Sequence, residues 1–302
     1  MQHRQLGKDG PDVSVIGLGA WPIGGGMGVL EEQASIATVR AAIDSGITLL
    51  DTAQAYRTSE STLGRALKDG YRERCFLATK VSGQYAPEDI ESAIDNSLKS
   101  LGVEYVDLYQ IHSWNSAYPI AATMETMARL QEAGKVRFIG VSNFNAAQMQ
   151  QAYEIVRFHS NQPRYNLFDR GIEGEDLAYC GKMGIGILPH SPLAKGLLTG
   201  KYTPDYIFPD DDERSDRPRF QGALFGKYLA VTEQLKGIAG DKGISMVQLA
   251  IAWLLRQSEV TCVLVGAKNP DQVKEHLGAA EVQFSEDELN RTEEILQHTP
   301  EG

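Results

Sequence analysis

The chain alternates short apolar runs with longer amphipathic segments. The short runs are apolar throughout rather than at every second residue, which is typical of parallel strands covered on both faces. Most begin about 30 residues after the previous one, as expected for repeated strand–helix units. Eight runs are predicted to be strands: Val13–Gly17, Ile47–Asp51, Phe76–Lys80, Val106–His112, Arg137–Val141, His159–Gln162, Ile185–His190 and Thr261–Val265.

The amphipathic segments between these runs are predicted to be helices. Several begin with proline or an acidic residue and end at a glycine, which suits a left-handed C-cap. The predicted helices are Glu32–Ser45, Ser59–Asp69, Pro87–Leu101, Pro119–Ala133, Ala146–Val156, Glu173–Met183, Gly226–Gly240, Met246–Gln257, Asp271–Ala279 and Glu286–Gln297.

Two segments fall outside the repeat. Met1–Gly10 predicts a strand and a turn, and it could plug the bottom of a barrel as half of a hairpin. Leu193–Arg219 is long, irregular and rich in Pro, Asp and Gly. A loop of this length in a compact domain is usually functional, so we expect a lid or a ligand clamp. Its acidic run, Asp210–Glu213, is expected to be solvated.

Eight strand–helix repeats in 302 residues predict an α/β fold, a (β/α)8 TIM barrel. We expect one domain over residues 1–302, with an N-terminal β-hairpin and a long insertion after strand 7. The rival fold is a doubly wound Rossmann sheet. Gly17 and Gly19 begin a GxGxxG pattern, but Pro22 stands at the third glycine. A nicotinamide cofactor would therefore not be held in the Rossmann manner.

Charge and cysteine usage narrow the class of protein. With 29 Lys and Arg against 40 Asp and Glu, the formal net charge is −11, so neither nucleic acid nor an anionic membrane surface is an expected partner. A local basic pocket for a phosphorylated cofactor is compatible with this balance. Cys75, Cys180 and Cys262 are widely spaced and form no CxxC, which argues against a disulfide framework and a zinc site. The sequence shows no signal peptide and no apolar run of 18 residues. Together with the cysteine pattern, this predicts a cytoplasmic protein. The oligomeric state stays open.

Polar side chains end the predicted strands. In a barrel, the C-terminal strand ends meet on one face, where functional groups lie. Tyr56 follows the second strand by five residues. The other strand-end residues are Asp51, Lys80, His112, Ser142, Asn143, Gln162, His190, Ser191, Gly266, Ala267 and Lys268.

Four of these residues suit acid–base chemistry on an alcohol or a carbonyl. A free tyrosine titrates near pH 10 and is a poor acid or base at neutral pH. The Lys80 ammonium would favour the phenolate of Tyr56 and lower its pKa, with Asp51 holding Lys80 in an ion pair. His112 could then orient or polarise a bound carbonyl.

The segment Asp51–Gly64, DTAQAYRTSESTLG, resembles the aldo-keto reductase signature DTAxxYGxSExxLG. Further blocks follow in the family's order: Ala78–Lys80, the strand ending at His112, Gly140–Phe144, Ser191–Tyr202 and Val265–Lys268. The similarity covers nearly the whole chain and is closest to the bacterial branch that includes the inositol-operon reductases. It implies a nicotinamide-dependent oxidoreductase that interconverts a carbonyl and an alcohol by hydride transfer, with sugars, polyols or aldehydes as substrates.

The resemblance also implies residue roles at the matching positions. Tyr56 would be the proton donor in reduction and the base in oxidation, Lys80 and Asp51 would tune it, and His112 would position the carbonyl. The implied cofactor-binding residues are Gly19, Ala20, Trp21, Asp51, Ser142, Asn143, Gln162, His190, Ser191, Pro192, Leu193, Gly196, Lys201, Gly266, Ala267, Lys268, Gln272, Glu275 and His276. The expected substrate-binding residues are Trp21, Tyr56, Arg57, His112 and Trp114, and no metal is expected.

The chain departs from the family pattern at both ends of the expected cofactor site. Arg57 stands where the family usually has Gly, which would favour a polar or anionic substrate, and His190 replaces a common nicotinamide-stacking aromatic residue. Gln272 and His276 replace an Arg and an Asn found in many members that bind NADPH, which weakens a clamp on the 2′-phosphate. The remaining basic candidates are Lys268 and Arg219. NADP(H) is favoured, with NAD(H) as the alternative.

Three other interpretations fit parts of the pattern. The Asp51–Lys80 pair could be purely structural. The protein could be a weakly catalytic binding module that senses the nicotinamide redox state. It could also be a metal-dependent barrel hydrolase that uses His112, His159 and His190, although no HxH or HExxH motif occurs.

Overall fold

Eight parallel strands form one curled sheet in the computed structural model, which describes residues 1–300. Their order is β10-β3-β4-β5-β6-β7-β8-β9. The backbone N–H of Thr261 donates to Ile187 O at 2.9 Å and that of Leu264 to Pro189 O at 3.0 Å, which joins the first and last strands and closes the barrel. The strands are β3 Ile16–Gly19, β4 Leu49–Asp51, β5 Phe76–Val81, β6 Val106–Ile111, β7 Val136–Ser142, β8 Ser160–Gln162, β9 Gly186–Ile187 and β10 Val263–Val265.

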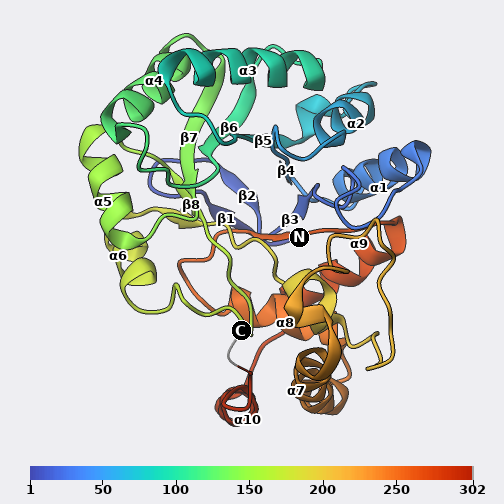
Figure 1. Ribbon diagram of the computed structural model, residues 1–302. Helices are drawn as coiled ribbons and strands as arrows, with labels where there is room; N and C mark the ends of the chain where they lie inside the picture. The colour runs from blue at the N-terminus through green and yellow to red at the C-terminus, as the bar shows by residue number, and fades with distance from the viewer. Residues whose placement is uncertain (301–302) are drawn as a thin grey trace.

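Helices surround the strands (Figure 1). The third helix shows why the sequence pattern predicts them well: Pro87 occupies its first turn, Glu88 and Asp89 follow, and Gly102 ends it at φ 66°. The helices are α1 Glu32–Asp44, α2 Ser59–Ala66, α3 Pro87–Leu101, α4 Ile120–Glu132, α5 Ala146–Ile155, α6 Glu175–Met183, α7 Gly222–Asp241, α8 Met246–Leu255, α9 Pro270–Leu277 and α10 Glu286–Leu296. The predicted (β/α)8 barrel is confirmed.

Several predicted boundaries are wrong, for local reasons. The run Val13–Gly17 is divided, because Asp12–Ser14 (β2) pairs away from the barrel and β3 begins only at Ile16. The sixth helix starts at Glu175 rather than Glu173, since Gly174 has a φ of 105° that no right-handed helix contains. The seventh helix starts four residues earlier than predicted, at Gly222.

A hairpin covers the bottom of the barrel, as predicted. Strand β1, His3–Gln5, pairs antiparallel with β2. Leu6 and Val13 are fully buried in the cluster that fills the inside of the barrel. Complete burial of such side chains stabilises the fold by about 1.5–3 kcal/mol each. In Figure 1 the two strands lie across the middle of the ring of strands.

The predicted insertion follows β9 and is largely irregular. It contains two short 3-10 turns, at Ala194–Thr199 and Pro218–Phe220, before α7 begins. Backbone groups of Met27 and Asp212 form an isolated antiparallel bridge, so the insertion lies against the segment between β3 and α1. Within residues 1–300 no single helix is long and apolar enough to cross a membrane, and α7 and α8 approach that composition only as a pair bent by 86°.

Candidate active site

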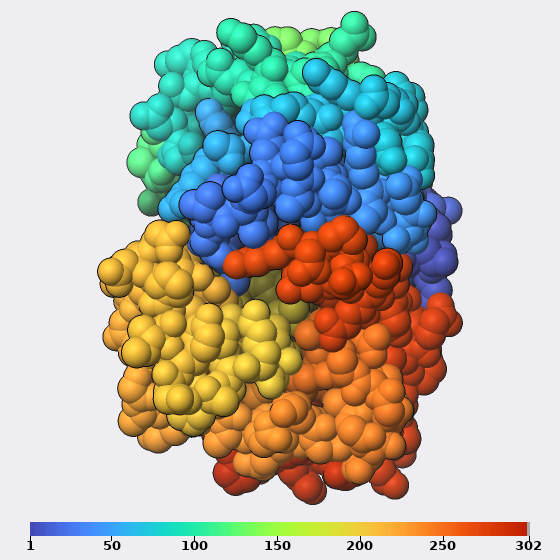
Figure 2. All heavy atoms as spheres, turned by 90° about the vertical axis from the view of Figure 1, so that its right-hand side faces the viewer, coloured from blue at the N-terminus to red at the C-terminus, as the bar shows by residue number. Residues whose placement is uncertain are grey.

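A cavity of about 710 Å³ opens at the C-terminal ends of the strands. Its walls come from the segment after β3, from the insertion and from the segment after β10. In Figure 2 these three segments, blue, yellow and red-orange, meet around a hollow. Cavities of about 300–1,000 Å³ are typical of small-molecule and cofactor sites.

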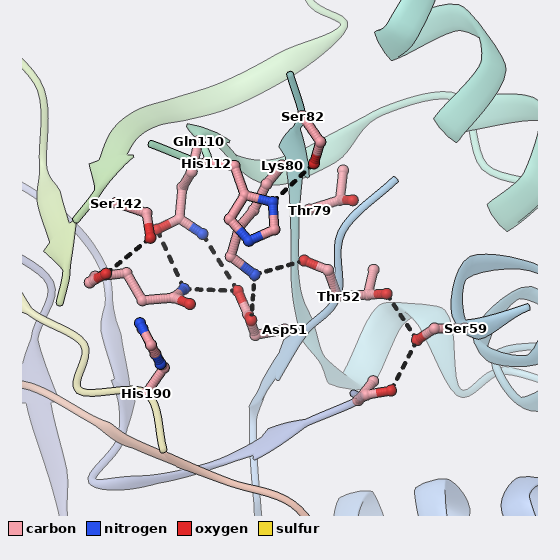
Figure 3. A network of polar contacts seen from close by, with 12 residues as sticks. Asp51, Thr52, Ser59, Thr79, Lys80, Ser82, Gln110, His112, Ser142 and His190 are labelled. Carbon is pink, nitrogen blue, oxygen red and sulfur yellow. Dashed lines mark hydrogen bonds and ion pairs between the residues drawn. The ribbon is translucent and has the colours of Figure 1, made fainter. Parts of the chain in front are cut away.

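A buried ion pair lies beneath the cavity. Lys80 Nζ is 2.5 Å from Asp51 Oδ1 and donates a second hydrogen bond to Thr52 O at 2.7 Å (Figure 3). The register pairs Asp51 with Ala78, so Lys80, two residues further along β5, points to the same side of the sheet. Burial lowers the pKa of Lys80, but Asp51 and Tyr56 together raise it by more, and the net pKa is raised. Lys80 is therefore an ammonium ion at neutral pH.

The second carboxylate oxygen of Asp51 also has partners. Gln162 Nε2 donates to Oδ2 at 2.9 Å and Gln110 Nε2 donates at 3.2 Å. Sequence reasoning missed Gln110, although an amide inside the apolar strand β6 was a signal. The two amides and Lys80 together hold the carboxylate in one orientation.

Tyr56 lies directly above the ion pair. Its ring centroid is 4.9 Å from Lys80 Nζ, and its ring makes edge contacts with Trp21 at 4.9 Å and His112 at 5.6 Å. Burial raises the pKa of the Tyr56 hydroxyl, the Lys80 ammonium lowers it, and Asp51 raises it again. The net pKa is raised, so the expected net lowering by Lys80 is not found in this structure, and the phenol is protonated at neutral pH.

His112 is neutral and faces the cavity. Burial, followed by the charge of Lys80, lowers its pKa to about 4. Its Nδ1 lies 2.7 Å from Ser82 Oγ (Figure 3). The structure thus brings together Asp51, Tyr56, Lys80 and His112, the four residues that the sequence grouped.

His190 is held at both edges of its ring. Nδ1 lies 3.0 Å from Ser191 Oγ, and Nε2 lies 3.0 Å from Asn143 Oδ1. The amide nitrogen of Asn143 donates to His112 O at 3.1 Å, which leaves Oδ1 as the acceptor toward His190. Burial and nearby cations lower the pKa of His190 to about 3, so its ring is neutral. With both edges bonded, the faces of the ring are the parts left for stacking.

The three residues expected at the carboxamide are adjacent but not equally accessible. Gln162 lines the cavity, whereas Ser142 and Asn143 do not. Ser142 Oγ donates to Gln162 O at 2.8 Å and accepts from Asn143 Nδ2 at 3.0 Å. Asn143 has a φ of 57°, a left-handed conformation that asparagine tolerates better than most residues. In this structure Ser142 and Asn143 therefore support Gln162 and His190.

The far part of the cavity contains most residues expected at the pyrophosphate and the adenosine. Ala20 and Ala267 are buried and do not contribute to its wall. The lining residues from the expected set are Ser191, Pro192, Leu193, Gly196, Lys201, Gly266, Lys268, Gln272, Glu275 and His276. Gly19, Trp21 and Asp51 line the cavity together with Tyr56 and His112.

Three expected residues point elsewhere. Arg57 Nη1 donates to Gly25 O at 2.9 Å and is exposed outside the cavity wall. Trp114 packs edge-on against Phe144 at 5.2 Å, also outside the wall. Arg219 pairs with Asp169 at 2.7 Å, so it is no longer a free cation for a phosphate. Local sequence did not reveal these partners.

The acidic run of the insertion is not simply solvated, contrary to expectation. Glu213 accepts a hydrogen bond from Trp21 Nε1 at 2.8 Å and forms ion pairs with Lys195 at 2.6 Å and Arg217 at 2.7 Å. Asp212 is buried and pairs with Arg214 at 2.5 Å. The insertion is thus attached to the aromatic wall beside Tyr56.

The cavity is positive although the chain is acidic. Its wall contains six cationic side chains against three carboxylates. The cations are Arg164, Lys195, Lys201, Arg214, Arg217 and Lys268, and the carboxylates are Asp51, Glu213 and Glu275. Such a wall suits a ligand that carries phosphate groups. Both the volume and the charge fit a nicotinamide dinucleotide.

The histidines do not form a common cluster. His112 and His190 line the cavity, whereas His159 packs edge-on against Phe138 at 4.9 Å. In the described part of the chain, no three His, Cys, Asp or Glu side chains are grouped so that they could hold a metal ion.

Comparisons of sequence and structure relate the chain to known proteins. The sequence profile described as "Aldo/keto reductase family" matches residues 15–297. Aldo-keto reductase YhdN of Bacillus subtilis is 41% identical over 288 residues, covering 91% of this chain and 87% of the relative. The NADH-specific methylglyoxal reductase of Escherichia coli is 32% identical over an alignment of 325 residues, covering 98% of this chain and 99% of the relative. The structure of a glycerol dehydrogenase from Gluconobacter oxydans superposes with a TM-score of 0.88 at 35% identity, covering 99% of this chain and 96% of the dehydrogenase.

Proposed function

The chain belongs to the aldo/keto reductase family and is therefore an NAD(P)H-dependent oxidoreductase, and we propose that it reduces a small carbonyl compound with Tyr56 as proton donor. One observation carries this proposal. The phenol of Tyr56 lies over the Lys80–Asp51 ion pair and beside His112, at one end of a positively charged cavity.

Tyr56 is suited to give up a proton during reduction. Its raised pKa keeps the hydroxyl protonated before the reaction. The charge of Lys80 is not screened by solvent, because its side chain is 0% exposed. As the proton leaves, this ammonium stabilises the developing phenolate in a medium where charges interact strongly. The Asp51 carboxylate keeps Lys80 charged and in place.

The walls of the cavity would hold the cofactor. When bound, the nicotinamide supplies the hydride. The amide nitrogen of Gln162 donates to Asp51. Its Oε1 is therefore left to accept a hydrogen bond from the carboxamide of the nicotinamide. A face of the His190 ring is left for stacking. Lys201 and Lys268 are available for phosphate oxygens, since within residues 1–300 neither has a carboxylate within ion-pair distance.

We propose NADPH as the preferred cofactor, with NADH as the alternative. Lys268 lies in the adenosine part of the cavity, where its Nζ donates to Met27 O and its backbone N–H to Gln272 Oε1 at 2.8 Å. An ammonium bonded only to a carbonyl keeps donors for a 2′-phosphate. The relative from Escherichia coli is NADH-specific by name, so family membership does not decide the preference.

We propose a small polar carbonyl or polyol as substrate. The named relatives include a methylglyoxal reductase and a glycerol dehydrogenase. We also propose a cytoplasmic location, because the three cysteines are free, as is usual in a reducing compartment.

Tyr56→Phe tests the proton donor. The variant keeps the ring and its contacts with Trp21 and His112, and it loses only the hydroxyl. We expect reduction of methylglyoxal to slow by about a thousandfold, as for loss of a general acid, with nearly unchanged cofactor affinity. Steady-state kinetics and fluorescence titration measure the two quantities.

Tyr105→Phe, at an exposed tyrosine that does not line the cavity, is the control and should behave as wild type. Wild-type kcat in Tyr56→Phe would show that another group donates the proton. A wild-type protein that binds cofactor tightly but reduces no carbonyl in a broad panel would instead support the redox-sensing alternative.

A further inference from the structure

Ser82 contacts the catalytic histidine from the neighbouring strand. It follows β5 directly, and the β5–β6 register, which ends at Val81 opposite Ile111, brings Ser82 beside His112. Its Oγ lies 2.7 Å from Nδ1 of the imidazole (Figure 3). Ser82 is outside both the family signature and the cavity wall, so sequence reasoning gave it no role.

The bond can be formed in two ways, and they differ at the opposite nitrogen. If the serine hydroxyl donates to Nδ1, the ring proton of neutral His112 must be on Nε2. If Nδ1–H donates to Ser82 Oγ, then Nε2 carries a lone pair. The ring lines the cavity, and within residues 1–300 no protein group hydrogen-bonds to Nε2. The tautomer therefore decides whether the cavity faces an N–H donor or a lone pair.

The hydroxyl proton favours one of the two arrangements. Among the described residues, Ser82 Oγ has no hydrogen-bond partner other than His112. If Nδ1–H were the donor, the hydroxyl proton of Ser82 would have no protein acceptor and would depend on solvent, which reaches this half-buried position only in part. Donation from Ser82 to Nδ1 satisfies both groups.

We propose that Ser82 is a positioning residue that donates its hydroxyl proton to Nδ1 of His112 and thereby fixes the Nε2–H tautomer. The neutral imidazole then presents an N–H to the oxygen of a bound carbonyl, beside the hydroxyl of Tyr56. Two donors, one from each residue, stabilise the negative charge that develops on this oxygen. The catalytic part of this inference rests on the proposed function, whereas the tautomer itself does not.

The test combines a spectroscopic readout with kinetics. Nitrogen-15 NMR of the histidine rings at pH 7 distinguishes the two tautomers in the cofactor-free protein, and His112→Asn assigns the signal among six histidines. We expect Nε2–H in the wild type and in Ser82→Thr, which keeps the hydroxyl. In Ser82→Ala we expect a mixture that contains Nδ1–H.

Ser113→Ala is the matched control. Ser113 belongs to the loop that follows β6, but its hydroxyl lies near Tyr85 at 3.4 Å and not near the imidazole. Its His112 signal should match the wild type. An Nδ1–H tautomer in the wild type, or an unchanged tautomer in Ser82→Ala, would overturn the proposal.

Kinetics test the use of the tautomer. In Ser82→Ala we expect kcat/KM for methylglyoxal to fall about tenfold, the factor that corresponds to a hydrogen bond of about 1.4 kcal/mol. Cofactor affinity should not change, and Ser82→Thr should restore the rate. A shifted tautomer with an unchanged kcat/KM would overturn the catalytic part. Absence of turnover in every variant and in the wild type would contradict the proposed function, while the NMR result would still decide the tautomer.

Discussion

Burial and charge shift the pKa of Tyr56 in opposite directions. The residue types alone suggest a lowered pKa, because a lysine stands nearby in the pattern. In the structure, desolvation of the phenol outweighs the ammonium. The raised pKa keeps the phenol of Tyr56 protonated. Carbonyl reduction needs this protonated form as the proton donor, not a phenolate. Sequence can thus name the interacting groups, but the sign of a shift depends on how deeply the fold buries them.

His276 gives a residue-scale prediction about stability. Burial lowers its pKa to about 4, well below the ordinary value near 6.5. Between these values the unfolded chain binds a proton that the folded protein does not, so the free energy of unfolding should fall as the pH falls from about 6.5 to 4. This one group should account for up to about 3 kcal/mol.

Urea unfolding of the cofactor-free protein across this pH range measures the effect. His276→Gln should lose less stability on acidification than the wild type. His3→Gln, at an exposed histidine of β1, should follow the wild-type curve. Parallel curves for His276→Gln and the wild type would mean that His276 does not titrate in this way.

At the scale of elements, the insertion differs most from its sequence-based description. Its length predicts a lid or clamp, whereas its acidic run is predicted to be exposed to solvent. In the structure Glu213 joins three parts of the molecule: the segment after β3 through Trp21, the start of the insertion through Lys195, and its end through Arg217. The carboxylate is 16% exposed, so its contacts are only partly screened by solvent.

Glu213→Ala should loosen the insertion. Three charge-assisted contacts are lost at once, and each such bond is worth about 1–3 kcal/mol in favourable cases. We expect cofactor affinity to fall about tenfold or more, with faster proteolytic cleavage within residues 201–219. Fluorescence titration and limited proteolysis measure the two effects.

Asp210→Ala is the control, because Asp210 is an exposed residue of the same run. It should bind cofactor as the wild type does. Equal affinity and equal cleavage rates for Glu213→Ala and Asp210→Ala would show that Glu213 does not hold the insertion.

The distribution of charge acts at the scale of the whole molecule. A chain of net charge −11 encloses a cavity wall with three more cations than carboxylates. This contrast favours anionic ligands inside the cavity and disfavours them elsewhere. Cofactor binding should therefore weaken as salt is added, since salt screens the attraction.

The comparison of NADPH with NADH tests this picture. We expect NADPH to bind at least about tenfold more tightly, a difference of about 1.4 kcal/mol, and the gap to narrow in high salt. Lys268→Met should reduce the gap. Lys274→Met, at an exposed lysine of α9 outside the cavity wall, should leave it unchanged.

Each other outcome has a definite meaning. Equal or tighter binding of NADH would overturn the proposed preference and favour an NAD-linked dehydrogenase of polyols or sugars. Binding of neither nucleotide would contradict the proposed function as a whole. Fluorescence titration of the purified protein distinguishes all three cases.

Sequence alone determined the order of strands and helices and the group of four residues that we propose to be catalytic. Both are local properties: apolar periodicity and glycine caps mark elements such as Pro87–Leu101, and the spacing from Asp51 to Tyr56 lies within one strand end and its loop. Parallel strands in a barrel bring their C-terminal ends to one face. Lys80 and His112 stand at such ends, so the sequence also places them beside Asp51 and Tyr56.

Tertiary structure alone decided the supporting contacts and the balance of charges. Glu213 meets Trp21 across 192 positions of the chain, and Gln162 meets Asp51 across 111. Ser82 reaches His112 only through the register of two strands. Such partners, and the burial that sets each pKa, depend on which surfaces pack together. No local pattern specifies that packing, because hydrogen bonds and desolvation are settled by distances in space rather than along the chain.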